Sequence, residues 1–130
     1  KAYKLRLSFI FIMELVALLS SGKGSWAQVS GLIKRGEWDS ILLVGDAFAE
    51  KFTIDSPAKH EFIKIDFDRK ILEIKEEIVK KLKEKINGIE VALSIASGSG
   101  KEHMALISAL LSIPVGVRFV VLTQEGIIYL

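Results

Sequence analysis

Two short loops of small residues, each carrying one lysine, have the composition of anion-binding segments. The first follows an apolar run that begins at residue 14, and it consists of Ser20, Ser21, Gly22, Lys23, Gly24 and Ser25. The second follows an apolar run at 91–96, and it consists of Ser97, Gly98, Ser99, Gly100 and Lys101. Glycines let a phosphate approach backbone N–H groups, hydroxyls donate hydrogen bonds, and lysine adds positive charge. Each loop is therefore interpreted as an anion-binding segment, with a plain tight turn as the alternative.

Neither loop matches a common nucleotide-binding motif. A P-loop needs glycine five residues before Gly100, where Ile95 stands, and serine or threonine after the lysine, where Glu102 stands. The segment at 22–24 lacks the third glycine of the dinucleotide fingerprint. The prediction of an anion site therefore depends on the two loops lying together.

Three side chains close to these loops or strand ends have two interpretations each. His103 could contact a base or assist proton transfer, but a surface histidine is the commoner case. Trp26 could stack on a base or pack internally, and Asp46 could line the cleft or cap a short helix. With only two histidines and no cysteine, the sequence supports neither a Ser-His-Asp arrangement nor a metal site, and no cofactor is expected.

The hydrophobic pattern predicts the elements that must position the loops. Continuous apolar runs are typical of buried parallel strands, whereas spacing by three or four residues predicts helices. Asp68 is expected to cap the longest helix and Gly88 to terminate it. The expected strands cover 14–20, 40–45, 61–67, 91–96, 116–123 and 127–130. The expected helices cover 26–34, 46–52 (one or two turns), 68–86, and the segment from the second loop to about 112.

Alternating strands and helices predict an α/β fold. We expect a Rossmann-like three-layer sandwich, with a mainly parallel central sheet and a C-terminal β-hairpin, as a single domain over 1–130. The first and fourth strands are the most apolar, so they are expected to be central neighbours. That arrangement would bring both loops to one edge of the sheet.

Charge and composition limit the partners. A net charge of +2 is too small for a general binder of long nucleic acids or membrane surfaces. The apolar run at 7–19 resembles a signal peptide, but Glu14 interrupts it, and the run is too short to span a membrane. Residues 1–12 are expected to be an extra edge strand or an N-terminal extension, and the location to be cytoplasmic. Abundant lysine, glutamate and isoleucine are typical of thermophiles.

Two segments resemble the C-terminal half of the CARF domain, the CRISPR-associated Rossmann-fold sensor: LSIASGSGKEHMALISALL at 93–111 and GVRFVVLTQEGIIYL at 116–130. In that family an apolar strand enters a small-residue loop ending in lysine, usually Thr-Gly-Gly-Thr-Lys, before a Met-containing helix and a final hairpin. Here Met104 follows the lysine, while Ser99 and Gly100 stand where the family more often has glycine and threonine. The first strand with its loop and the 64–82 passage are also similar, so the resemblance covers about 13–130.

The resemblance implies a homodimer whose two sites merge across a two-fold axis and bind a cyclic oligoadenylate, most often the four-membered ring, in antiviral defence. The matching ligand-binding positions would be the loops at 20–25 and 97–101. Some family members are metal-independent ring nucleases, in which the adenosine 2′-OH attacks its own phosphate. In such an enzyme Lys101 would stabilise charge, and Ser20 or Ser21 would position the phosphate.

Three functions therefore stay open from the sequence: a cyclic oligoadenylate sensor, a stand-alone ring nuclease, and a Rossmann-like domain that binds another nucleotide or a protein. Family members usually carry an effector domain after the hairpin. The resemblance therefore implies that this chain is either a stand-alone domain or a fragment.

Overall fold

The computed structural model describes residues 12–20 and 26–130. Its six strands lie in the order β3-β2-β1-β4-β5-β6, all parallel except the final antiparallel pair β5 and β6. In chain order the elements are β1 (Glu14–Leu19), α2 (Trp26–Arg35), β2 (Ser40–Gly45), the 3-10 helix η2 (Phe48–Lys51), β3 (Lys59–Lys64), α3 (Ile71–Leu82), β4 (Glu90–Ser94), α4 (Gly100–Ser112), β5 (Gly116–Thr123) and β6 (Gly126–Tyr129).

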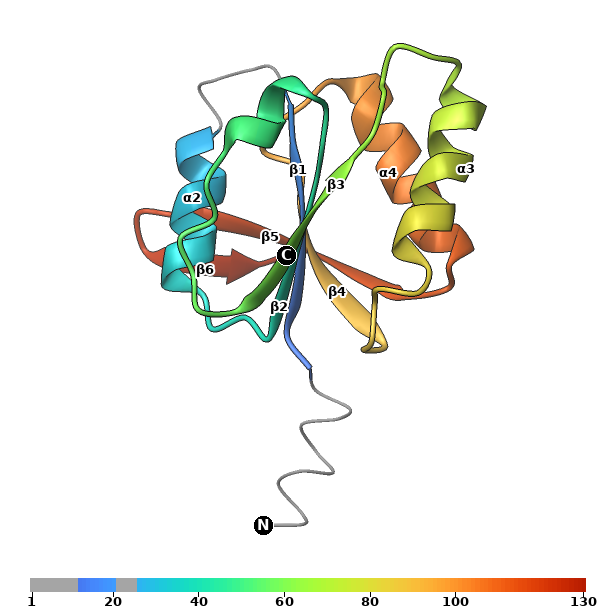
Figure 1. The fold of residues 1–130 in the computed structure, drawn as a ribbon. Coiled ribbons are helices and arrows are strands. Elements are labelled where there is room, and N and C mark those ends of the chain that lie inside the picture. The colour runs from blue at the N-terminus through green and yellow to red at the C-terminus, as the bar shows by residue number, and fades with distance from the viewer. Residues whose placement is uncertain (1–11, 21–25) are drawn as a thin grey trace.

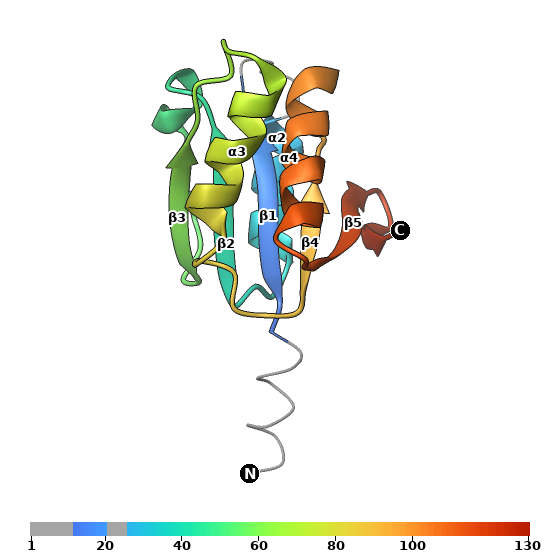
Figure 2. The same cartoon turned by 90° about the vertical axis from the view of Figure 1, so that its right-hand side faces the viewer.

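Helices cover both faces of the sheet, as the predicted Rossmann-like sandwich requires. Figures 1 and 2 show α3 and α4 side by side on one face and α2 on the other. Successive side chains of a strand point to opposite faces. Val16 and Leu18 of β1 accordingly join the core under α3 and α4, whereas Leu15, Ala17 and Leu19 join the core under α2. A strand covered on both faces reads as one apolar run, which is why the sequence predicts β1 well.

The strand order of the sheet changes direction between the neighbouring strands β1 and β4. It moves outward from β1 through β2 to the edge strand β3, and then returns to β4 on the other side of β1. The prediction that the first and fourth strands are neighbours is therefore confirmed. Because β1 and β4 are parallel, their carboxyl ends meet at one edge of the sheet, at the point where such folds bind ligands.

The predicted bounds of the third strand and the longest helix are wrong. The strand expected at 61–67 occupies Lys59–Lys64, at the edge of the sheet. The helix expected at 68–86 runs from Ile71 to Leu82, and Lys70 rather than Asp68 is its N-cap residue. Ile71, the first residue of the helix, is 39% exposed. Gly88 lies beyond the helix and does not terminate it.

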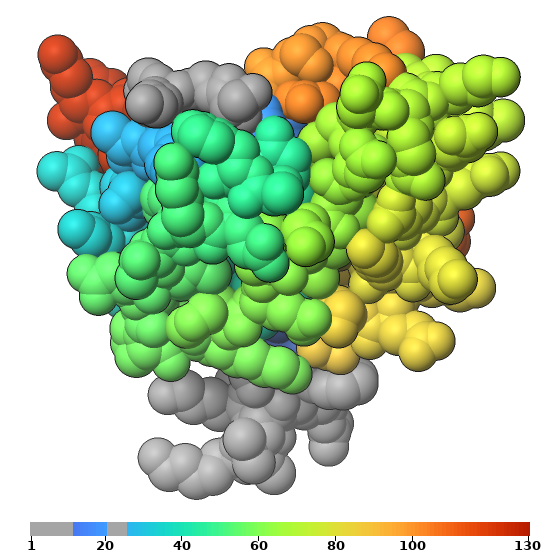
Figure 3. All heavy atoms as spheres, turned by 45° about the horizontal axis from the view of Figure 1, so that its top comes forward, coloured from blue at the N-terminus to red at the C-terminus, as the bar shows by residue number. Residues whose placement is uncertain are grey.

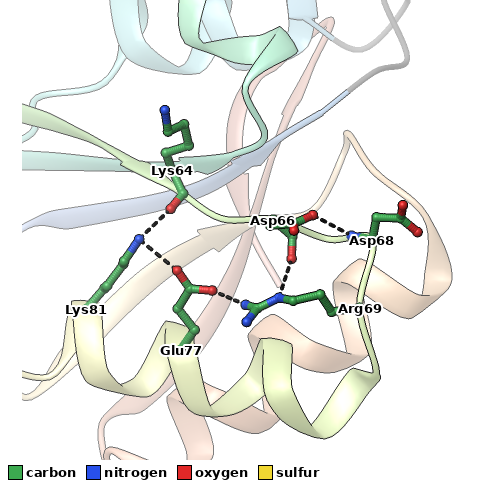
Figure 4. A network of polar contacts seen from close by, with 6 residues as sticks. All are labelled: Lys64, Asp66, Asp68, Arg69, Glu77 and Lys81. Atoms are coloured by element: carbon green, nitrogen blue, oxygen red, sulfur yellow. Dashed lines mark hydrogen bonds and ion pairs between the residues drawn. The ribbon is translucent and has the colours of Figure 1, made fainter.

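Side-chain contacts explain why α3 starts late. The N–H of Asp68 donates to the Asp66 carboxylate at 2.9 Å, which makes a turn where the sequence predicts a cap. Arg69 donates to the Asp66 carbonyl and pairs with Glu77 on α3, as Figure 4 shows. Lys81 contacts the same Glu77 and also donates to the Lys64 carbonyl. These contacts hold the connection between β3 and α3 outside the helix.

The strand expected at 91–96 is β4, which ends earlier, at Ser94. The short helix expected at 46–52 is η2, and the Asp46 carboxylate accepts the Ala49 N–H at 2.9 Å. The C-terminal hairpin is formed by β5 and β6. Of the expected edge strand or extension at 1–12, only Ile12 is described, and it is not in a strand. No helix within 12–20 and 26–130 has the length and apolar character needed to cross a membrane.

Glu14 has a structural role at the amino end of β1. Its side chain is buried, and its carboxylate accepts the N–H groups of Asn87, at 2.9 Å, and Gly88, at 2.7 Å. It also accepts the hydroxyl of Ser40 at 3.1 Å. A buried carboxylate is tolerated only when donors replace its hydration. Glu14 therefore ties the start of β1 to β2 and to the connection that leads into β4.

Replacing Glu14 with alanine is expected to lower the free energy of unfolding by about 2 kcal/mol, because it removes the acceptor for three donors. Chemical denaturation followed by circular dichroism measures this change. Glu76→Ala, at an exposed position on α3, is the control and is expected to change stability by less than about 0.5 kcal/mol. Equal stability of the two variants would contradict the role assigned to Glu14.

Candidate functional site

The first predicted loop contacts the second at Ser20, which is the residue of the first loop that the structure describes. Ser20, the residue after β1, donates its N–H to the Ser97 hydroxyl oxygen at 3.1 Å, across 77 positions of sequence. Both serines are buried. Figure 3 looks onto this edge of the sheet, where the start of α4 (orange) and the η2 segment (teal-green) stand on either side of the end of β1 (blue). The other residues of the first loop, Ser21, Gly22, Lys23, Gly24 and Ser25, lie outside the described residues.

Ser99 caps α4. Its hydroxyl oxygen accepts the Glu102 N–H at 3.3 Å, and the Glu102 carboxylate accepts the Ser99 N–H at 2.8 Å. This reciprocal pair is a capping box, which satisfies two donors at the helix start. The Ser99 hydroxyl oxygen therefore acts as the N-cap of α4.

Gly98 and Gly100 differ in whether their position in the structure requires a glycine. Gly98 has φ +101°, and a Cβ there would lie 2.4 Å from Leu18 Cδ2 and 2.9 Å from Glu102 Oε1. Gly100 begins α4, and no atom lies within 4 Å of the place where its Cβ would be. The loop therefore needs glycine at 98 for its conformation, whereas glycine at 100 leaves the helix start open.

Lys101 is an exposed cation at this edge. Within the described residues no carboxylate forms an ion pair with it. The first N–H groups of a helix have no partners within the helix, and those of Gly100 and Lys101 belong to exposed residues. The start of α4 thus presents one ammonium group and backbone donors at the carboxyl edge of the sheet.

Glu102 is the residue at this edge whose role the sequence reasoning missed. Beyond its capping contact, its Oε1 atom accepts the Ser20 hydroxyl at 2.9 Å, so it joins the end of β1 to the start of α4. The pattern Ser-x-x-Glu at 99–102 was the available signal for the capping box. The contact with Ser20 has no local signal, because the two residues are 82 positions apart.

The side chains of His103 and Trp26 both donate hydrogen bonds to backbone carbonyls of the chain. The His103 ring donates from Nε2 to the Ser97 carbonyl at 2.8 Å and so braces the second loop. The Trp26 indole N–H donates to the Ser20 carbonyl at 2.8 Å, and its ring packs against Phe48 and Phe52 at centroid distances of 5.7 Å. The packing interpretation of Trp26 is therefore confirmed.

A hollow of about 420 Å³ lies beside η2 and α3, at the carboxyl ends of β2 and β3. Asp46 and Lys64 line it together with the paired Glu77 and Lys81. Lys64 also lies 3.6 Å from Glu50. The charges around this hollow are of both signs and largely paired, unlike Lys101. Within the described part of the chain, no group of three histidine or acidic side chains could hold a metal ion.

Gly98→Ala is expected to destabilise the protein by about 1–2 kcal/mol, because the positive φ strains an L-residue and the new methyl group overlaps Leu18. Gly100→Ala is the matched control, expected to be neutral or slightly stabilising at the helix start. Thermal denaturation of the two variants compares them directly. If Gly98→Ala is as stable as Gly100→Ala, the loop geometry described above is wrong.

No family model and no curated protein matches the sequence. Five chains of solved structures do match. One is Can2 from Sulfobacillus thermosulfidooxidans, solved in complex with cyclic tetra-adenylate, with a TM-score of 0.54 and 11% sequence identity. The match covers 90% of this chain and 34% of Can2, so the chain spans about a third of that protein's length. At this identity the likeness concerns the fold, and it agrees with the CARF-like Rossmann fold that the sequence resembles.

Proposed function

We propose that this chain is a cytoplasmic nucleotide-sensing domain that binds a cyclic oligoadenylate in CRISPR-linked antiviral defence. The observation that carries the proposal is the junction of Ser20 and Ser97 at the switch point of the sheet, beside the exposed Lys101. The similarity of the loop to the CARF family supports it. So does the shared fold with Can2, which was solved with cyclic tetra-adenylate.

The described residues suggest how phosphate would be held. The Lys101 ammonium would neutralise part of the phosphate charge, and the N–H groups of Gly100 and Lys101 would donate to its oxygens. The hydroxyl oxygens of Ser97 and Ser99 already accept backbone N–H groups, which shapes the loop, and each hydroxyl still has one O–H that would donate to a phosphate oxygen. Lys23 and the rest of the first loop would complete the site.

The proposed assembly is a homodimer, and the exposed face of α4 supports it. Met104 is 62% exposed and Leu111 is 66% exposed. They lie seven positions apart, so they share one face of the helix. The C-terminal Leu130 is 76% exposed. Large exposed apolar side chains on one face favour self-association. A second copy related by a two-fold axis would also suit a cyclic tetranucleotide, whose four repeated units allow two-fold symmetry.

The ring-nuclease alternative stays a prediction. It needs Ser20 or Ser21 to position the phosphate, whereas the Ser20 hydroxyl is buried and donates to Glu102. Incubation with labelled cyclic tetra-adenylate separates the functions: binding without products supports sensing, and linear products support the nuclease. Absence of binding at tens of micromolar would contradict both and would leave a different nucleotide or a protein as the partner.

Lys101→Ala is expected to weaken binding of cyclic tetra-adenylate by about 1–3 kcal/mol, because it removes a charged hydrogen-bond donor to phosphate. Isothermal titration calorimetry measures the affinity. Lys83→Ala removes an equal charge from an exposed position after α3 and is the control. Equal affinities of wild type and the Lys101 variant would remove Lys101 from the site.

Leu111→Glu is expected to convert the dimer into a monomer, because it places a charge in the proposed apolar interface. Light scattering after size-exclusion chromatography measures the mass. Leu72→Glu changes a leucine of similar exposure on α3 and should leave the dimer intact. A monomeric wild type, or a dimer unaffected by Leu111→Glu, would contradict this interface.

A further inference from the structure

The second loop already binds a carboxylate oxygen, which is part of the Glu102 side chain. Glu102 Oε1 accepts the Ser99 N–H at 2.8 Å and the Ser20 hydroxyl at 2.9 Å. One donor comes from the loop after β4 and the other from the end of β1. These are the two segments that the proposed phosphate site brings together.

The loop backbone is shaped closely around this carboxylate. A Cβ at Gly98 would lie only 2.9 Å from Glu102 Oε1, and the positive φ of Gly98 turns the chain around the oxygen. Leu18 Cδ2 lies 2.4 Å from the same Cβ position. A phosphate oxygen could reach the Ser99 N–H and the Ser20 hydroxyl only after the carboxylate had left them.

Neutral groups hold the Glu102 charge. Within the described residues its carboxylate forms no ion pair with lysine or arginine, and its partners there are an N–H group and a hydroxyl. The start of α4 adds the favourable field of the helix dipole. Glu102 therefore places a negative charge next to Lys101, which would weaken the attraction of this edge for a single phosphate.

We propose that Glu102 is a specificity-determining residue that competes with the ligand phosphate for the donors of the loop. A ligand with one phosphate gains too little to displace the carboxylate, whereas a cyclic oligonucleotide contacts the site through several phosphates at once. The identity of the ligand rests on the proposed function. The competition itself applies to any phosphate that enters the loop.

Glu102→Gln tests this competition, because glutamine keeps the capping-box pattern and the side-chain size but removes the charge. Glu73→Gln is the matched control: Glu73 lies in the first turn of α3, at the same third helical position, and is exposed. Inorganic phosphate is titrated into nitrogen-15-labelled wild type and both variants, with the Ser99 and Lys101 amide signals as the readout. Cyclic tetra-adenylate is then titrated by calorimetry.

In Glu102→Gln, millimolar phosphate is expected to shift the Ser99 and Lys101 amide signals, while wild type and Glu73→Gln do not respond. Affinity for cyclic tetra-adenylate is expected to rise about tenfold in Glu102→Gln alone. If folded Glu102→Gln shows no phosphate response, or binds the cyclic ligand no more tightly than a wild type that binds it, the inference is overturned. If no variant binds the cyclic ligand but Glu102→Gln responds to phosphate, the proposed function fails and the role of Glu102 stands.

Discussion

Burial of β1 on both faces is the constraint on which the rest of this structure depends. From Leu15 to Leu19 every side chain is fully buried, because β2 and β4 flank the strand and helices cover it on both sides. The polar residues at its two ends, Glu14 and Ser20, are buried as well, so the chain must supply hydrogen-bond partners for them. The polar residues around the ends of β1 follow from that requirement.

Two carboxylates meet this requirement at opposite ends of the strand. Glu14, at the amino end, accepts two N–H groups and a hydroxyl and ties distant segments together. Glu102 accepts the Ser20 hydroxyl just after the carboxyl end, but it lies in the first turn of α4, partly exposed and beside Lys101. A carboxylate that accepts hydrogen bonds therefore has a structural role at the amino end of β1, and another one lies at the candidate site near the carboxyl end. The exposure of the second carboxylate makes its displacement by an external anion physically reasonable.

The bounds of a strand or helix could be predicted where its own hydrophobic pattern determines which of its residues are buried. The apolar run of β2 matched at Ser40 and Gly45, and the helix expected at 26–34 is α2, Trp26–Arg35. The start of α3 was not predictable, because the turn at Asp66 and the ion pair between Arg69 and Glu77 hold the preceding residues outside the helix. Those contacts compete with local helix propensity, which favours Asp68 as a cap.

The sequence by itself determined the α/β class, the central position of the two most apolar strands, and the edge at which Ser20 and the 97–101 loop meet. These features follow from hydrophobic periodicity and from the geometry of parallel sheets, which act over short stretches of chain. Only the tertiary structure decided that Trp26 and His103 donate hydrogen bonds within the chain and that Glu102 accepts the Ser20 hydroxyl. Such pairings join residues up to 82 positions apart, and no local pattern specifies which donor a carboxylate reaches across a folded core.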